Sequence, residues 1–220
     1  MTMTSTAHIH SDRITDEAGR RAALALLAAT YEKEKGWIAE PHSQFPAAHL
    51  GRPDISWYMV FMAGEPVGVL RTVYDPPLLQ YAKYDLAILD PRLDIPRFLA
   101  QNRIAEVGRF AVLAPHRGNL LLAVALMRAA MEDILNRGCT HIITDVFEDD
   151  AHSPLGFHTR VIGFVPIATH THGELNCQSR RITLLLDLKS SYHRLKGRGN
   201  WVYRQLTANW PPALHRCLAA

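Results

Sequence analysis

The sequence has no long apolar run, and this absence excludes several kinds of protein. No stretch approaches the roughly 20 apolar residues that a membrane-spanning helix needs. The polar stretch 1–11 has no apolar core flanked by positive charge, so we expect no signal peptide. We expect instead that residues 1–15 form a flexible N-terminus.

Cysteine is also scarce. The three cysteines, Cys139, Cys177 and Cys217, lie far apart in the sequence. Their number and spacing exclude a disulfide framework and a C-x-x-C zinc site. This usage predicts a protein of the reducing cytoplasm.

The formal net charge is only +3, which is too small to indicate nucleic-acid binding. Apolar residues make up 48% of the chain and charged residues 20%, as in ordinary globular proteins. We therefore expect one folded domain over 16–188. The remaining tail, 189–220, carries several lysines and arginines and no acidic residue, and we expect it to be helical.

The order of the apolar segments predicts the fold class. The predicted elements are a helix (16–35), a hairpin (56–63 and 66–73), a strand (104–113), a long helix (119–137), a strand (140–147), a short helix (154–161) and two strands (164–171 and 180–188). Short helices are also expected near Leu86 and Phe98. A mixed central sheet with helices on both faces, an α/β (α+β) fold, fits this order. Strands 104–113 and 140–147 should be parallel, because a helix connects them.

The strongest motif is the strand, turn and helix over 104–122. A helix that follows a strand offers free backbone N–H groups to an anion or a carbonyl, although an ordinary β-α connection has the same pattern. The segment resembles the central strand and pyrophosphate loop of the GNAT acyltransferases, which move an acyl group from a thioester to an amine. The resemblance implies that Arg117, Gly118 and Asn119 bind the acyl donor, and that backbone N–H groups near Val112 stabilise the oxyanion.

This turn departs from the family pattern. Leu120 and Leu122 stand where the family has small residues that let the backbone approach a pyrophosphate. An acyl carrier protein presents only a phosphopantetheine arm and needs no such cradle. We therefore expect an acyl carrier protein as donor and partner, and no cofactor beyond this co-substrate. A small-molecule acetyltransferase that uses acyl-CoA is the second interpretation, and a catalytically silent module that senses an acyl or metal ligand is the third.

Four short motifs resemble one branch of the family. The segment Glu106–Val112 is similar to the E-S-R-F-x-V strand of acyl-homoserine lactone synthases and N-acyl amino acid synthases. The segments 31–37, 66–73 and 163–164 resemble three further motifs of these enzymes in the same order. The resemblance implies acyl transfer from an acyl carrier protein to the amine of an amino acid.

Two departures argue against lactone synthesis. Leu27 stands where lactone synthases have an arginine, and Asp54 is the one acidic residue that fits a loop where they have two. In that family these groups bind S-adenosylmethionine. The resemblance therefore implies an N-acyl amino acid or a similar N-acyl amine as the product.

The same strand carries the expected catalytic residues. Residues three apart in a regular strand face opposite ways, but a bulge at Gly108 would bring Glu106 and Arg109 to one side. Glu106 would then accept the proton of the attacking ammonium, and Arg109 would pair with Glu106 or with a substrate carboxylate. The alternative is a structural ion pair. His158, near the motif 163–164, is the candidate acid for the leaving thiolate.

Three residues are expected to line the acceptor site. Arg71 lies mid-strand, where a buried guanidinium needs a carboxylate partner, although a surface arginine has the same pattern. Trp37 and Asp54 would complete the site, although an aromatic residue such as Trp37 is often part of a core.

Two further features have competing interpretations. His170, His172 and Glu174 alternate on one face of a predicted strand, as metal ligands do, but a solvated strand end has the same pattern and we expect no metal site. The cations of 189–220 would attract an acidic carrier protein. A packed C-terminal cap and a peripheral membrane contact are the alternatives, and we expect no nucleic-acid partner.

Overall fold

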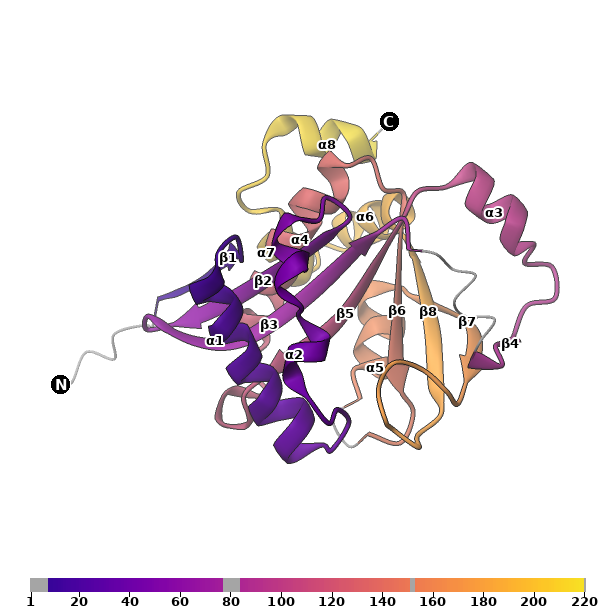
Figure 1. The fold of residues 1–220 in the computed structure, drawn as a ribbon. Helices are drawn as coiled ribbons and strands as arrows, with labels where there is room; N and C mark the ends of the chain where they lie inside the picture. The colour runs from indigo at the N-terminus through magenta and orange to yellow at the C-terminus, as the bar shows by residue number, and fades with distance from the viewer. Residues whose placement is uncertain (1–7, 77–83, 151–152, 220) are drawn as a thin grey trace. The chain divides into compact units, whose positions relative to one another are not determined.

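The computed structural model describes residues 8–76, 84–150 and 153–219 (Figure 1). Within these ranges the strands form one sheet in the order β1-β2-β3-β5-β6-β8-β7-β4. Strands β5 and β6 are parallel, as the sequence predicts, whereas β6 and β8 are antiparallel. The expectation of a mixed sheet in an α/β fold is therefore confirmed.

The bounds of the elements follow the predicted order closely. The strands are β1 (Ile9–Arg13), β2 (Ile55–Met62), β3 (Glu65–Tyr74), β4 (Ala87–Ile88), β5 (Ile104–Val112), β6 (His141–Phe147), β7 (Val165–His170) and β8 (Arg181–Asp187). The α-helices are α1 (Glu17–Leu27), α2 (Pro41–Gln44), α3 (Ile95–Gln101), α4 (Leu120–Asn136), α5 (Leu155–Phe157), α6 (Leu188–Gly197), α7 (Trp201–Thr207) and α8 (Pro212–Ala219). The described residues also form the π-helical segments η1 (Ala28–Glu34) and η5 (His158–Ile162) and the 3₁₀ segments η2 (Ala47–Gly51) and η4 (Ala114–His116).

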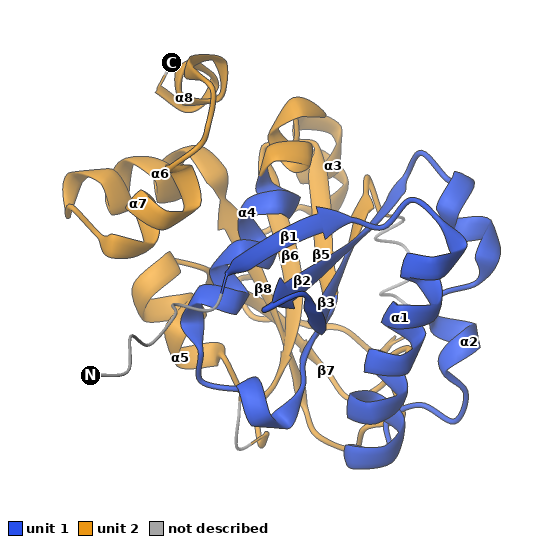
Figure 2. Cartoon of the chain, turned by 90° about the vertical axis from the view of Figure 1, so that its left-hand side faces the viewer, with its two compact units in different colours: residues 1–71, 109–131 blue, residues 72–108, 132–220 orange. Residues whose placement is uncertain are grey.

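The chain divides into two compact units (Figure 2). Unit 1 contains residues 1–71 and 109–131, and unit 2 contains residues 72–108 and 132–220. The expected boundary after residue 188 does not coincide with this division. Helix α6 follows β8 directly, and its Ser191 hydroxyl donates a hydrogen bond to the Ile162 carbonyl at 2.8 Å. The C-terminal helices are therefore packed parts of unit 2.

Unit 1 begins with a strand where a flexible end was expected. Residues 9–13 pair with β2, from Ile9 opposite Met62 to Arg13 opposite Tyr58. The Ser11 hydroxyl donates to the Ala125 carbonyl of α4 at 2.7 Å. The expectation for 1–15 is thus wrong for β1. Polar residues at a sheet edge satisfy the hydrogen-bond ladder without producing an apolar pattern.

The predicted helix 16–35 forms as α1 followed by η1. Asp16 caps its start, because its carboxylate accepts a hydrogen bond from the Gly19 N–H at 2.7 Å. Gly36 ends it with φ +64°, a conformation that glycine adopts without strain. The wider π-helical turns place Tyr31 in the core of unit 1.

Close packing explains the glycine of the β3 motif, Gly68. A Cβ atom at Gly68 would lie 2.8 Å from the carbonyl oxygen of Ala111 on β5. Only a glycine allows the two backbones to approach this closely. The motif therefore marks a close strand contact within unit 1.

Strand β6 forms the core of unit 2. It pairs with β8 from His141–Asp187 through Phe147–Arg181, and its residue Ile142 is fully buried. On its other side, the described pairs with β5 run from His141 opposite Ile104 to Ile143 opposite Glu106.

No residue of segment 84–103 in unit 2 is buried. The expected helix near Phe98 is α3. Near Leu86, Tyr84 has a 3₁₀ conformation and Ala87 and Ile88 form the short strand β4, while residues 77–83 lie outside the described part of the chain. Strand β4 pairs with β7 at the sheet edge. A two-residue strand is too short to produce the alternation that identifies longer strands.

Candidate active site

Strand β5 is irregular where the sequence predicts a bulge. The irregular residue is Arg109, whose φ of +50° lies in the left-handed region. For a residue with a Cβ this conformation costs about 1–2 kcal/mol, and such strain is concentrated at functional sites. Glu106 is half-buried in unit 2 and Arg109 is 9% exposed in unit 1.

Within unit 1, the Arg109 side chain is bound by a residue that the sequence analysis missed. Its Nε donates a hydrogen bond to Oε1 of Gln44 at 2.7 Å. Gln44 ends the short helix α2, inside a proline-rich stretch without apolar periodicity. No sequence signal marks it, because the two residues are 65 positions apart.

Arg117 is held inside unit 1. Its Nη2 donates to Oε2 of Glu34 at 2.6 Å, and its Nε donates to the Val112 carbonyl at 3.0 Å. The ion pair is partly buried, with side-chain exposures of 23% for Arg117 and 34% for Glu34. The cation of the predicted donor loop is therefore already paired with a carboxylate of its own unit.

The loop residues Gly118 and Asn119 lie directly before the start of α4. Gly118 has φ +85°, and the Asn119 carboxamide oxygen accepts a hydrogen bond from the Leu121 N–H at 3.1 Å. Leu120 and Leu121 are 48% and 49% exposed, whereas Leu122 is fully buried. Of the two leucines that the sequence analysis singled out, only Leu120 lies on the surface. Leu122 is a core residue.

The aromatic pair of the acceptor motif packs within unit 1. Trp37 is half-buried, and its ring centroid lies 5.5 Å from that of Tyr31. The Tyr31 hydroxyl donates to the carbonyl of Phe110 on β5 at 3.0 Å. Phe110 is 40% exposed, so this contact joins η1 to a solvent-facing part of β5.

The other two predicted acceptor residues have different surroundings. Arg71 is 8% exposed in β3, so it is a buried arginine and not a surface one. Asp54 forms a surface ion pair in which Arg52 Nε donates to its Oδ1 at 2.9 Å. This hydrogen bond lowers the pKa of the Asp54 carboxyl. Asp54 therefore already has a cation as its partner.

His158 does not have the properties of an acid. It is half-buried in unit 2, and its ring stacks on Phe164 at a centroid distance of 4.9 Å. Burial lowers the pKa of His158 to about 4, because a low-dielectric environment disfavours the charged imidazolium. The imidazole is therefore neutral at pH 7, and we correct its expected role as acid for the thiolate.

Unit 2 contains a buried polar cluster that the sequence analysis did not assign. The His170 Nε2 lies 3.2 Å from Oδ2 of Asp145, and its Nδ1 lies 2.6 Å from the His172 carbonyl. A carbonyl only accepts, so Nδ1 carries a proton. The Thr183 hydroxyl donates to Oδ1 of Asp145 at 2.8 Å.

This cluster removes the basis for a metal site at the histidine motif. His170 is 3% exposed and committed to Asp145, whereas His172 is solvent-exposed. In the described part of the chain, no group of three or more His, Cys, Asp or Glu side chains is arranged to hold a metal ion. Strand β7 ends at His170, so His172 lies beyond the strand that contains His170.

A comparison with protein families now identifies the fold. The model of the acetyltransferase (GNAT) family matches residues 21–164. The chain belongs to the GNAT family. It is thus an acyltransferase by family, as the strand and loop over 104–122 predict.

Solved structures of other GNAT-fold proteins resemble this one. FeeM, an N-acyl amino acid synthase from uncultured soil microbes, has a TM-score of 0.66 and 16% identity, over 90% of this chain and 98% of its own. The aminoglycoside acetyltransferase AAC(6')-Ib in complex with coenzyme A has a TM-score of 0.54 and 15% identity, over 86% and 99%. RimL, a ribosomal L7/L12 α-N-protein acetyltransferase in complex with coenzyme A, has 0.54 and 14%, over 84% and 96%. No curated protein matches at the sequence level.

The first of these likenesses is to a protein of the branch that the four motifs indicated, and at 16% identity it shows a shared fold. One motif also has a structural reason in this GNAT chain. Gly163 ends η5 with φ +100°, and a Cβ there would lie 2.1 Å from the Arg194 guanidinium. Both its conformation and its close contact require glycine. Among the described residues, no helix has the length and apolar character needed to cross a membrane.

Replacing Asp145 with alanine should lower the free energy of unfolding by about 2 kcal/mol. The change leaves a buried imidazole and a buried hydroxyl without their shared acceptor. The loss is moderated because the Asp145 side chain is 25% exposed. Urea denaturation at pH 7 measures it, with Asp149→Ala as a control on the exposed turn that follows β6. Equal stability of the two variants would show that the cluster contributes nothing.

Proposed function

We propose that this GNAT protein transfers an acyl group from the phosphopantetheine thioester of an acyl carrier protein to the amine of an amino acid or a similar small amine. The observation that carries the proposal is the internal ion pair of Arg117 with Glu34. A loop whose cation is already neutralised is poorly suited to a pyrophosphate. A carrier-protein donor has no nucleotide that would need this cation. The likeness to an N-acyl amino acid synthase supports the same product class.

We propose Glu106 as the general base. It lies in β5 opposite Ile143 of β6, in the last described pair between these two strands. In the proposed reaction Glu106 takes a proton from the substrate ammonium, directly or through a water molecule. The amine nitrogen then forms a bond to the thioester carbonyl carbon, and the C–S bond breaks to release the thiolate. Backbone N–H groups near Val112 would stabilise the intermediate oxyanion.

The C-terminal helices supply a surface that suits an acidic donor protein. The exposed cations of α6, α7 and α8 and their connections are Lys189, Lys196, Arg198, Arg204 and Arg216, and no acidic residue lies between 189 and 219. Such a surface attracts an acidic partner and speeds its association at low salt. Several apolar residues of these helices, such as Leu195, Leu214 and Leu218, are buried, and Trp201 is 37% exposed. One exposed aromatic residue is a small apolar surface, which favours a charged docking surface over a membrane anchor.

A second candidate function is an acyl-CoA-dependent acetyltransferase. It is favoured by the likeness to two acetyltransferases whose structures contain coenzyme A. The exposed Leu120 and Leu121 at the start of α4 argue against it, since bulky side chains hinder the approach of a pyrophosphate to the backbone. The silent sensing module has less support, because the family consists of transferases.

The proposal is tested by measuring thiol release from acyl carrier proteins and from acyl-CoAs with a pool of amino acids, and by identifying products by mass. Release from the carrier protein, with an N-acyl amino acid as product, would support it. Release from acetyl-CoA alone would establish the second candidate. Intact thioesters with every amine would refute both.

A further inference from the structure

The loop between β5 and α4 satisfies much of its backbone with acceptors of its own unit. The N–H groups that donate to acceptors between Leu113 and Asn119 are those of His116, Arg117, Asn119, Leu121 and Leu122. For Leu121 the acceptor is the Asn119 carboxamide oxygen, at 3.1 Å. A helix N-terminus binds a diphosphate through backbone N–H groups that have no internal partner. In this loop, several of those groups already have one.

The guanidinium of Arg117 also donates from three nitrogen atoms to acceptors of unit 1. Nη1 and Nη2 donate to Oε1 and Oε2 of Glu34, with a distance of 2.6 Å for the Nη2 bond, so the ion pair is bidentate. Nε donates to the Val112 carbonyl at 3.0 Å. Arginine binds carboxylate and phosphate groups in this same bidentate way. Glu34 therefore occupies Arg117 much as a bound phosphate would.

The backbone that presents the Glu34 carboxylate is held against β5. Glu34 is the last residue of η1. Three residues earlier, the buried Tyr31 donates from its hydroxyl to the Phe110 carbonyl of β5 at 3.0 Å. Three residues later, the Trp37 N–H donates to the Tyr31 carbonyl at 2.7 Å. The carboxylate is thus kept within reach of Arg117, and an anionic ligand of this loop has to compete with it.

We propose that Glu34 is a specificity-determining residue that makes this enzyme reject coenzyme A as a donor. The inference rests on the proposed function and names the residue that selects its donor. A diphosphate at this loop would have to displace the carboxylate from Arg117 and would meet its negative charge at close range. Coenzyme A carries a diphosphate and a 3′-phosphate, whereas the arm of a carrier protein carries a single phosphodiester. The repulsion therefore acts more strongly on coenzyme A.

Glu34→Gln and Glu32→Gln provide a matched test. Both changes remove one negative charge from η1, but the carboxylate that Arg117 binds is that of Glu34. We expect Glu34→Gln to bind coenzyme A about tenfold or more tightly than the parent in isothermal titration calorimetry, because the charge repulsion is lost and Arg117 can pair with the diphosphate. Glu32→Gln should match the parent. Pantetheine, which has no phosphate, should bind all three proteins alike, and circular dichroism checks that the variants fold.

Further variants show whether the gain acts through the cation. Glu34→Ala should strengthen coenzyme A binding at least as much as Glu34→Gln, because alanine offers no acceptor to Arg117. Adding Arg117→Ala to Glu34→Gln should abolish the gain, as expected for two residues that act through each other. Equal affinity of the parent and both Glu34 variants for coenzyme A would overturn the inference, and so would a gain that survives the removal of Arg117.

Kinetics separate this inference from the proposed function. With an acyl-CoA and an acyl carrier protein that carry the same acyl chain, Glu34→Gln should shift the ratio of the two kcat/KM values towards acyl-CoA by about tenfold or more. Acyl transfer with an unchanged ratio would overturn the inference while leaving the proposed function intact. Absence of transfer from every donor would refute the proposed function, and the coenzyme A titrations would still decide whether Glu34 excludes the diphosphate.

Discussion

Replacing Glu106 with glutamine should lower kcat/KM for acyl transfer by about 10²–10⁴-fold at neutral pH. Glutamine keeps the shape of the side chain but cannot accept the proton that the ammonium must lose before the nitrogen attacks. In the register of the parallel strands β5 and β6, Glu106 lies opposite Ile143, the last described pair. The loss should appear mainly in kcat, because the amide still occupies the same space.

The measurement is the initial rate of thiol release from an acyl carrier protein at several pH values. Glu65→Gln is the control, since Glu65 is an exposed glutamate at the start of β3. It should retain full activity. If Glu106 is the base, raising the pH should partly restore the variant, because more of the amine is then already deprotonated. A Glu106→Gln enzyme with the rate of the parent would exclude Glu106 as the base.

Much of the fold is predictable because its central strands have strong local patterns. The sequences of β5 and β6 combine β-branched and aromatic residues with a helix between them, which predicts a parallel pair. Strand β1 is missed because an edge strand need not be apolar. Strand β4 is missed because two residues cannot show an alternation. In both cases the strand is stabilised by a partner distant in sequence.

The candidate site is predictable only where a motif is local. The loop from Val112 to Asn119 is a contiguous motif and is visible in the sequence as the turn between β5 and α4, but the ion pair of its Arg117 with Glu34 spans 83 positions. Asp145 is visible as one carboxylate in an apolar strand. Its partner His170 is 25 residues away and was assigned to a different motif. Such pairs depend on strand register, which a single sequence does not specify.

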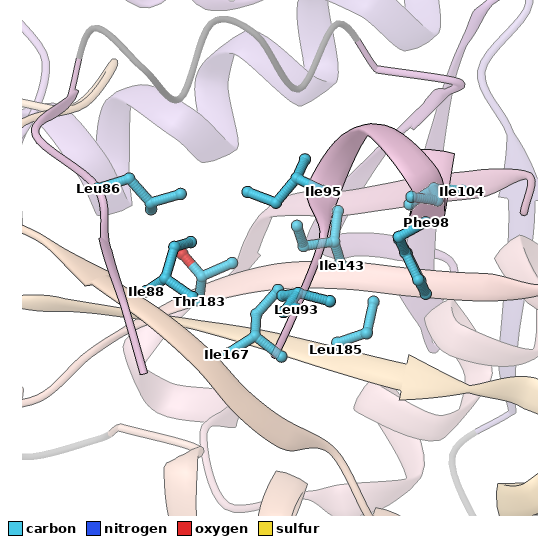
Figure 3. Close-up of a pocket in the computed structure, with 10 residues that line it drawn as sticks. All are labelled: Leu86, Ile88, Leu93, Ile95, Phe98, Ile104, Ile143, Ile167, Thr183 and Leu185. Carbon is cyan, nitrogen blue, oxygen red and sulfur yellow. The ribbon is translucent and has the colours of Figure 1, made fainter. Parts of the chain in front are cut away.

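The apolar pocket of unit 2 (Figure 3) is a second feature that a single sequence does not specify. The residues of β5, β6 and β8 that form its floor are predicted as strand residues, and their apolar character indicates burial. Whether a covering segment then packs tightly or leaves space depends on side-chain volumes across segments far apart in the chain. Here 84–103 covers the floor without becoming buried.

Acidification should destabilise the protein through His158. In the folded chain burial lowers the pKa of His158 to about 4, from its ordinary value of 6.5. Between these values the unfolded chain binds a proton that the folded chain excludes. The stability is therefore complete above about pH 6.5 and is lost as the pH falls towards 4. This histidine alone should cost about 3 kcal/mol of unfolding free energy at pH 4, relative to pH 7.

The variant His158→Phe isolates this contribution. Phenylalanine suits the aromatic surroundings of Phe157 and Phe164 and carries no ionisable group. Urea denaturation from pH 7 to pH 4 should show a smaller loss of stability for the variant, whereas His193→Phe, at an exposed position of α6, should lose as much as the parent. Other titrating groups, including His141, whose pKa burial also lowers, affect all three proteins alike. Equal losses in all three would show that the ring is not held neutral.

The activity of the same variant tests the chemistry. A neutral imidazole at pH 7 has no readily donated proton, so we expect His158→Phe to keep kcat within about threefold of the parent. A thiolate is stable enough to leave without a general acid, whereas an ammonium cannot attack without losing its proton. We therefore expect the proposed reaction to depend on one proton transfer, at Glu106, rather than on two. A large loss of kcat in a folded His158→Phe enzyme would restore the need for an acid at the thiolate.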